Sequence, residues 1–125
     1  MKIVALVPMK ANSERVKGKN FKNFCGKPLF RWILDTLNSI KDIDSIVINT
    51  DAIDLFKKCS LDEYAKVIFR ERPDEICGDL VSMNRVIEND VNNLDADIFL
   101  MTHSTNPLLS KQSIEECISL FKDAY

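Results

Sequence analysis

The chain has 125 residues, a length typical of a single domain. Its 17 basic and 19 acidic residues nearly balance, and 46% of the residues are hydrophobic, which is the composition of a soluble globular protein rather than a disordered one. The net charge of -2 gives no general positive field, so we expect neither nucleic acid nor a membrane as a partner. Any site for an anion must therefore be local.

The cysteines favour a reducing compartment. Cys25, Cys59, Cys77 and Cys117 are widely spaced and form no CxxC pair, and only His103 is available to complete a zinc site. We interpret them as reduced thiols of a cytoplasmic protein. No apolar run is long enough to cross a membrane, and the amino-terminal segment lacks the apolar region of a signal peptide.

Short apolar runs that are rich in β-branched residues recur four times and predict strands. They lie at Ile3–Val7, Ser45–Asn49, Lys66–Phe69 and Asp97–Met101. Because these runs are continuous rather than alternating, we expect strands that are covered on both faces, as in a parallel sheet.

A segment with helical spacing of its apolar residues follows each strand. The four segments are marked by Leu29 to Ile40, by Ile53 and Phe56, by Val86, Ile87 and Val91, and by Ile114, Cys117, Ile118 and Phe121. Pro28 suits the first turn of the first helix, and Ser110 is a candidate cap for the fourth. The alternation predicts an α/β fold with a Rossmann-like, mainly parallel sheet and flanking helices. Ligands of such sheets bind at the carboxyl ends of the strands.

The connection Pro8–Pro28 is far longer than the usual two to six residues between a strand and its helix. It contains one acid, Glu14, and six of the 17 basic residues: Lys10, Arg15, Lys17, Lys19, Lys22 and Lys27. A mildly acidic chain thus concentrates positive charge at the ligand edge of its sheet, as a polyphosphate site requires. The alternative is a solvent-exposed loop whose lysines only keep the protein soluble. In either case we expect Lys17, Lys22 and Lys27 to be solvated.

The stretch PMKANSERVKGKN fits neither the GxxxxGK[ST] phosphate loop nor the glycine-rich dinucleotide pattern. We assign Lys10, Arg15 and Lys19 to neutralising the oxygens of a triphosphate. Asn12, Ser13 and free backbone N–H groups would supply neutral donors.

The strand IVALVP and the segment MKANSERVKGKNFKNFCGKPLF after it carry an ordered motif. Its elements are Lys10, Ser13, Lys19–Asn20 and Gly26–Lys27–Pro28. The motif resembles the amino-terminal signature of sugar cytidylyltransferases, most of all the acylneuraminate cytidylyltransferase (CMP-sialic acid synthetase) group and its legionaminic-acid-type relatives. The family often has arginine where Lys10 stands. The compact ammonium of lysine therefore replaces a guanidinium that can donate two parallel hydrogen bonds to one phosphate. The resemblance implies that Met9, Ala11 and Asn20 also line the nucleotide.

The segment RPDEICGD at Arg72–Asp79, followed by Ser82, resembles the RPxELAxD segment of the same family. The resemblance implies that Arg72 and Ser82 border the cytosine. It makes Asp79 a candidate for substrate binding, or for ordering this loop. The alternative for Arg72 is a surface ion pair with Asp74 or Glu75.

The segment THSTNPLL at Thr102–Leu109 stands where sialic-type members have LQPTSPLR, so His103 replaces a substrate-facing glutamine. We interpret His103 as a binding or packing group rather than a general base. The related 3-deoxy-manno-octulosonate (KDO) enzymes carry QGDEP here, with a metal-binding aspartate at the position of Thr105. A threonine cannot replace a carboxylate ligand of Mg²⁺, so Thr105 favours the sialic-type branch.

The resemblance implies the fold of nucleotide-diphospho-sugar transferases and a reaction that transfers CMP from CTP to a nine-carbon 2-keto sugar acid, with release of pyrophosphate. It also implies Mg²⁺, with carboxylate ligands, sugar pocket and dimerisation element in a carboxy-terminal half. Residues 1–125 would then be the amino-terminal nucleotide-binding part of a single cytidylyltransferase domain, which forms a homodimer in the full-length protein. The alternatives are a non-catalytic nucleotide-binding or assembly module and a nucleotidyltransferase for another sugar such as KDO.

Overall fold

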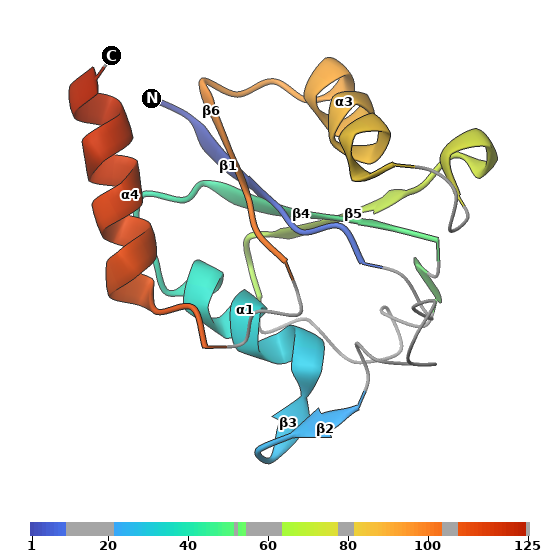
Figure 1. Cartoon of the computed structure of the whole chain (residues 1–125), viewed down its shortest axis with the longest axis horizontal. Coiled ribbons are helices and arrows are strands. Elements are labelled where there is room, and N and C mark those ends of the chain that lie inside the picture. The colour runs from blue at the N-terminus through green and yellow to red at the C-terminus, as the bar shows by residue number, and fades with distance from the viewer. Residues whose placement is uncertain (10–21, 52, 55–63, 78–81, 104–107, 125) are drawn as a thin grey trace.

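The computed structural model describes residues 1–9, 22–51, 53–54, 64–77, 82–103 and 108–124 (Figure 1). Their strands and helices are β1 (Ile3–Leu6), β2 (Asn23–Phe24), β3 (Lys27–Pro28), α1 (Leu29–Asn38), β4 (Ser45–Thr50), β5 (Val67–Glu71), the short 3₁₀ helix η3 (Asp74–Ile76), α3 (Met83–Asn93), β6 (Ile98–Met101) and α4 (Lys111–Ala124). The short second helix predicted around Ile53 and Phe56 lies mostly outside the described residues. No described helix has the length and apolarity needed to cross a membrane.

Four strands form one parallel sheet in the order β5–β4–β1–β6. The central strand β1 pairs with β4 on one side and with β6 on the other, for example through Val4 opposite Ser45 and Ile3 opposite Ile98. All four predicted strands are therefore confirmed, and so is the parallel α/β fold.

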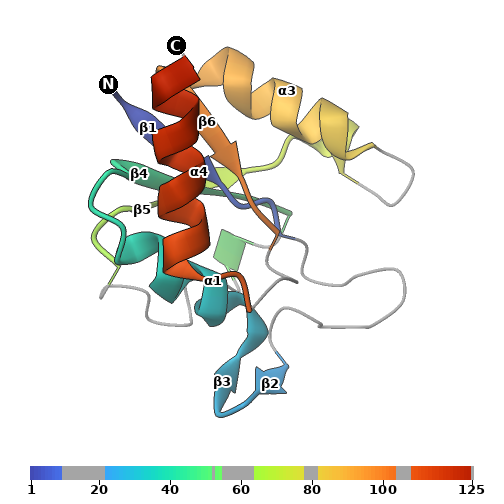
Figure 2. The same cartoon turned by 60° about the vertical axis from the view of Figure 1, so that its left-hand side comes forward.

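Helices cover both faces of this sheet. Figures 1 and 2 show α1 and α4 on one side and α3 on the other. Successive residues of a strand point to opposite faces, so Ile3 and Ala5 pack in the core that includes α1 and α4, whereas Val4 and Leu6 pack beside Ile87 of α3. This two-sided burial explains why the runs of β1 and β4 are apolar without interruption. In β5, at the edge of the sheet, Val67 and Phe69 pack against the core but Ile68 is 49% exposed, so the expectation of burial on both faces is wrong for that strand.

The helix starts follow the sequence signals, with one correction. Pro28 lies at the N-cap position of α1 rather than inside its first turn, because it still pairs in β3. The hydroxyl of Ser110 accepts a 3.1 Å hydrogen bond from the backbone N–H of Ser113, so Ser110 caps the start of α4 as predicted.

The end of the long basic connection is a β-hairpin that the sequence analysis treated as loop. Strands β2 and β3 are antiparallel, and the two turn residues, Cys25 and Gly26, have φ angles of 50° and 101°, as a tight two-residue turn requires. The indole N–H of Trp32 donates a 2.7 Å bond to the carbonyl of Phe24. The ammonium of Lys27 lies 4.0 Å from the centre of the same indole ring. Trp32 thus holds the hairpin against α1.

The core predicts a clear difference between two leucine-to-alanine substitutions. Leu34 of α1 is fully buried, whereas Leu120 of α4 is 72% exposed. Leu34→Ala should lower the free energy of unfolding by about 2–5 kcal/mol, because it opens a cavity in the core. Leu120→Ala should change it by less than about 0.5 kcal/mol. Urea denaturation followed by circular dichroism measures both, and equal effects would contradict the described packing of α1.

Candidate nucleotide-binding site

The carboxyl ends of the parallel strands form one edge where the chain leaves the sheet. Backbone hydrogen bonds continue past the ends of the strands. The N–H of Met9 donates to the carbonyl of Asn49 over 3.0 Å, and the N–H of Arg72 donates to the carbonyl of Thr50 over 2.8 Å. The N–H of Thr102 donates to the carbonyl of the last residue of β1 over 3.0 Å. Segments far apart in the sequence therefore meet at the edge where ligands of such sheets bind.

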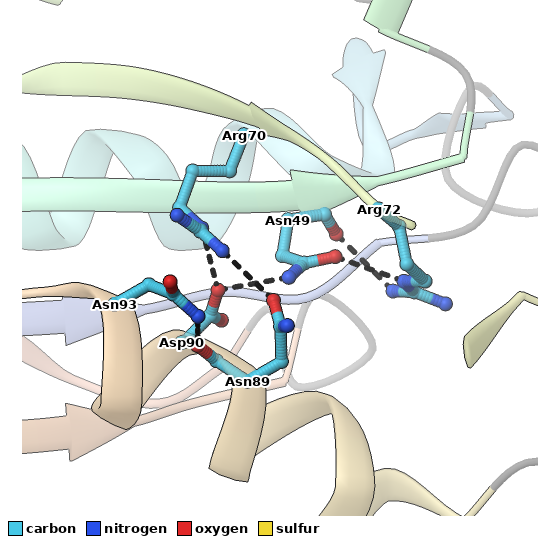
Figure 3. Close-up of polar contacts among 6 residues, drawn as sticks. All are labelled: Asn49, Arg70, Arg72, Asn89, Asp90 and Asn93. Atoms are coloured by element: carbon cyan, nitrogen blue, oxygen red, sulfur yellow. Dashed lines mark hydrogen bonds and ion pairs between the residues drawn. The ribbon is translucent and has the colours of Figure 1, made fainter. Parts of the chain in front are cut away.

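Arg72 is the predicted site residue at this edge whose side chain makes the most hydrogen bonds in the described structure. It is only 3% exposed. Its Nε donates to the side-chain oxygen Oδ1 of Asn49 over 2.9 Å, and its Nη2 donates to the backbone oxygen of Asn49 over 3.1 Å (Figure 3). The guanidinium is therefore buried rather than at the surface, and the side chain of Asp74, one of the two partners considered for an ion pair, lies outside the described residues. Among the described side chains no carboxylate pairs with Arg72, and a guanidinium has five N–H groups, so donors remain for a ligand.

A chain of polar side chains connects Arg72 to α3, and Figure 3 draws it. Nδ2 of Asn49 donates to Oδ1 of Asp90 over 2.8 Å, and Nε of Arg70 donates to the same oxygen over 3.0 Å. Nη2 of Arg70 donates in addition to Oδ1 of Asn89 over 2.8 Å. We call Arg70, Asp90, Asn49 and Arg72 the Asn49 relay. It connects β4, β5 and α3.

The register of the sheet and the spacing of the helix account for the relay. Asn49 lies two residues after Val47, which faces α3, and it is paired with Arg70 in the ladder between β4 and β5. Asp90 follows the buried Val86 by four residues, so both lie on the stripe of α3 that faces the sheet. The sequence analysis did not select Asn49 or Asp90 as site residues. The available signals were an amide at the end of an apolar strand and an acid within an apolar helical stripe.

The structure also places three other predicted site residues. Met9 is 1% exposed and its side chain belongs to the core, so only its backbone can contact a ligand. Ser82 is exposed at the N-cap of α3, and its hydroxyl makes no capping hydrogen bond. His103 is exposed directly after β6 and Thr102. These positions are compatible with the predicted roles of Ser82 and His103 but do not test them.

We expected Lys27 to be solvated, but its ammonium has two partners in the structure. Its ammonium forms an ion pair with Asp35 of α1 as well as lying over Trp32. Lys27 therefore links the hairpin to α1.

The remaining predicted site residues lie outside the described residues and stay predictions: Lys10, Ala11, Asn12, Ser13, Arg15, Lys19, Asn20, Asp79 and Thr105. The described part of the chain contains no group of three or more His, Cys, Asp or Glu side chains that could hold a metal ion.

Comparison with known proteins identifies the family. Residues 4–125 match the family described as Cytidylyltransferase. The chain belongs to this cytidylyltransferase family. The match covers nearly the whole chain and confirms the family that the motifs at the first strand and at Arg72 indicated.

The relatives of this cytidylyltransferase chain are enzymes named for different sugar acids. It is 28% identical to an 8-amino-3,8-dideoxy-manno-octulosonate cytidylyltransferase of Shewanella frigidimarina, over 98% of this chain and 48% of the relative. It is 25% identical to a pseudaminic acid cytidylyltransferase of Campylobacter jejuni, over 97% of this chain and 53% of the relative. The chain thus spans about half the length of the curated relatives it matches.

Solved structures confirm the fold. A CMP:2-keto-3-deoxy-manno-octonic acid synthetase complexed with CTP superposes with a TM-score of 0.77 at 20% identity, covering 98% of this chain and 48% of that one. A 4-diphosphocytidyl-2C-methyl-D-erythritol synthase from Anaerococcus prevotii gives a TM-score of 0.69 at 19% identity, covering 96% and 51%. The cytidylyltransferase chain therefore has the predicted fold of nucleotide-diphospho-sugar transferases.

One buried hydroxyl at the strand edge gives a testable prediction. Oγ1 of Thr102 is buried and has no hydrogen-bond partner in the described structure. Thr102→Val replaces an unpaired hydroxyl by a methyl group of similar size, so it should leave the free energy of unfolding unchanged or raise it by about 1 kcal/mol. Thr36→Val is the control for a hydroxyl that has a partner, because Oγ1 of Thr36 donates to the carbonyl of Trp32 over 3.1 Å and the substitution removes this hydrogen bond. Thermal unfolding measures both, and a loss of more than about 1 kcal/mol for Thr102→Val would show that its hydroxyl has a partner.

Proposed function

We propose that this chain is the nucleotide-binding part of an enzyme that transfers CMP from CTP to a 2-keto sugar acid and releases pyrophosphate. The observation that carries the proposal is the buried Arg72 at the carboxyl edge of the sheet, within the segment RPDEICGD that resembles the family's cytosine segment. The names of the relatives support the reaction class, since they are cytidylyltransferases for pseudaminic acid and manno-octulosonate sugars.

Arg72 is proposed to bind the cytosine together with Ser82. A guanidinium carries only donors. The edge of cytosine presents two adjacent acceptors, O2 and N3, whereas the N3 of uracil carries a hydrogen and would face these donors. A fixed guanidinium therefore favours CTP over UTP, because a donor that meets another donor stays unpaired in a buried site.

The connection after β1 is proposed to hold the triphosphate. It begins at Met9, whose N–H is bonded to Asn49, so the connection leaves the sheet at the edge where Arg72 lies. Lys10, Arg15 and Lys19 would neutralise the phosphate oxygens, and Asn12 and Ser13 would donate to them. Ala11 and Asn20 would line the nucleotide beside them.

The reaction is proposed to proceed by in-line attack of the sugar's anomeric hydroxyl at the α-phosphorus of CTP. The protein has little covalent chemistry to perform in such a transfer, so positioning and charge neutralisation dominate. Arg72 would hold the base, and the three basic residues of the connection would stabilise negative charge that develops on the departing pyrophosphate.

A nine-carbon sugar acid of the sialic or legionaminic type is the proposed acceptor, because Thr105 stands in place of the metal-binding aspartate implied for the KDO branch. His103 and Asp79 would approach the substrates from this edge. A manno-octulosonate acceptor is the second candidate, and the Shewanella relative favours it.

Mg²⁺, a homodimer and a cytoplasmic location belong to the proposal as well. The described residues contain no carboxylate cluster for the metal, so they do not by themselves provide a site and no step is derived through it. Mg²⁺ usually binds substrate phosphates and only one or two carboxylates, which fits a triphosphate substrate. The thiols of Cys25 and Cys117, which form no disulfide in the described residues, fit a reducing compartment.

Calorimetric titration of the chain with CTP, UTP and ATP in Mg²⁺ tests the nucleotide assignment. We expect CTP to bind at least about tenfold more tightly than UTP, because Arg72 meets acceptors on cytosine only. Binding without any preference for CTP would contradict the cytidylyltransferase assignment for this site. Absence of binding by all three nucleotides would favour the assembly module.

The role of Lys19 is tested by comparing a triphosphate with a nucleoside. Lys19→Ala should weaken CTP binding about tenfold and leave cytidine binding unchanged, because the substitution removes a charge-assisted contact to phosphate. Lys41→Ala is the matched control, since Lys41 is an exposed lysine between α1 and β4. Equal losses for CTP and cytidine would argue against a phosphate role for Lys19.

A further inference from the structure

Asn49 sits between two groups of opposite hydrogen-bonding character. The carboxylate of Asp90 only accepts, and the guanidinium of Arg72 only donates. The amide satisfies both, with Nδ2 donating to Asp90 over 2.8 Å and Oδ1 accepting from Arg72 over 2.9 Å. The opposite amide orientation would bring donor against donor and acceptor against acceptor. The neighbours of Asn49 therefore permit one orientation of its side chain.

The far end of the relay is also fixed. Asp90 is 1% exposed, and its Oδ1 accepts from Arg70 as well as from Asn49. The ion pair with Arg70 compensates the buried negative charge of Asp90. Arg72 is held from a second direction, because its Nη2 donates to the backbone oxygen of Asn49. The guanidinium plane of Arg72 is thus defined by two bonds to one residue.

We propose that Asn49 and Asp90 are positioning residues that set the orientation of the Arg72 guanidinium and thereby the preference of this site for cytosine. Arg70 acts behind them by holding Asp90. The inference rests on the proposed role of Arg72 in binding CTP. It assigns the selectivity of the site to side chains on β4 and α3 that need not touch the nucleotide.

The direction of the effect follows from geometry. Hydrogen bonds weaken steeply when the angle at the hydrogen falls below about 120°, so a rotated guanidinium loses its alignment with the base. Asn49→Asp is nearly isosteric with the natural residue but places two carboxylates against each other at Asp90. It should disturb the orientation of Arg72 without creating a cavity. Asp90→Asn should disturb it less, because asparagine at position 90 still offers an acceptor to Asn49.

The test is calorimetric titration of the full chain and its variants with CTP, UTP and inorganic tripolyphosphate in Mg²⁺. For Asn49→Asp we expect CTP affinity to fall about tenfold and the preference for CTP over UTP to shrink by a similar factor. Affinity for tripolyphosphate should change by less than about threefold, since the relay acts on the base. Asn92→Asp, on the exposed side of α3, adds the same charge outside the relay and should leave all three affinities unchanged.

A double variant separates positioning from a general structural role. In Asn49→Asp combined with Asp90→Asn, the amide at position 90 donates to the carboxylate at position 49, which still accepts from Arg72. The hydrogen bonds are restored with the charge moved, so the preference for CTP should recover to within about threefold of the natural chain. Circular dichroism melting of each variant checks that the fold is retained.

The outcomes distinguish this inference from the function on which it rests. If the natural chain shows no preference for CTP, both the proposed function and the positioning role fail. If the natural chain prefers CTP and a folded Asn49→Asp variant keeps that preference within about threefold, the function stands and the positioning role is wrong. A double variant that is no more selective than Asn49→Asp overturns the positioning role too. If Asn49→Asp does not fold, Asp90→Asn takes its place: a folded Asp90→Asn variant whose preference for CTP equals that of the natural chain overturns the positioning role.

Discussion

The hydrogen bonds of Asn49 connect β4 to α3 and to the segments that follow β1 and β5 at the carboxyl edge of the sheet. Its backbone oxygen accepts from the N–H of Met9, three residues after β1, and from the guanidinium of Arg72, and its side chain bonds to Arg72 and to Asp90. Three strands and a helix thus depend on one amide residue. A buried donor or acceptor that loses its partner costs about 1–3 kcal/mol, so these bonds must form as a set.

The fold could be predicted from the sequence because its signals are local and repeated. The apolar runs of the four strands lack alternation. Burial on both faces produces this pattern in β1, β4 and β6, whereas Ile68 of the edge strand β5 is 49% exposed. The hairpin of β2 and β3 was missed for a local reason. Cys25 adopts a positive φ angle, which residues other than glycine, asparagine and aspartate rarely do. The sequence therefore did not mark Cys25 as a turn residue.

The candidate site could be predicted only in part. The motif around Arg72 identified the residue, but most of the residues around it in the sequence are charged, so its 3% exposure was not expected. Asn49 and Asp90 are 41 residues apart and become neighbours only through the packing of α3 on the sheet and the pairing of Asn49 with Arg70. A single sequence contains no signal for such a long-range match. The assignments to Lys10, Arg15 and Lys19 rest on the motif alone.

The central position of β1 has a consequence for the timing of folding. Ile3 pairs with Ile98, and the N–H of Lys2 donates to Asp97, 95 residues further along the chain. A ribosome that adds about 5–20 residues per second needs roughly 5–20 seconds to make that distance. During this interval the most buried strand of the sheet has one unpaired side, and closing so long a loop is slow. Of the four described strands of this sheet, the one that is synthesised first therefore completes its pairing only with the last, β6, and the bond between Leu6 and Thr102 forms with it.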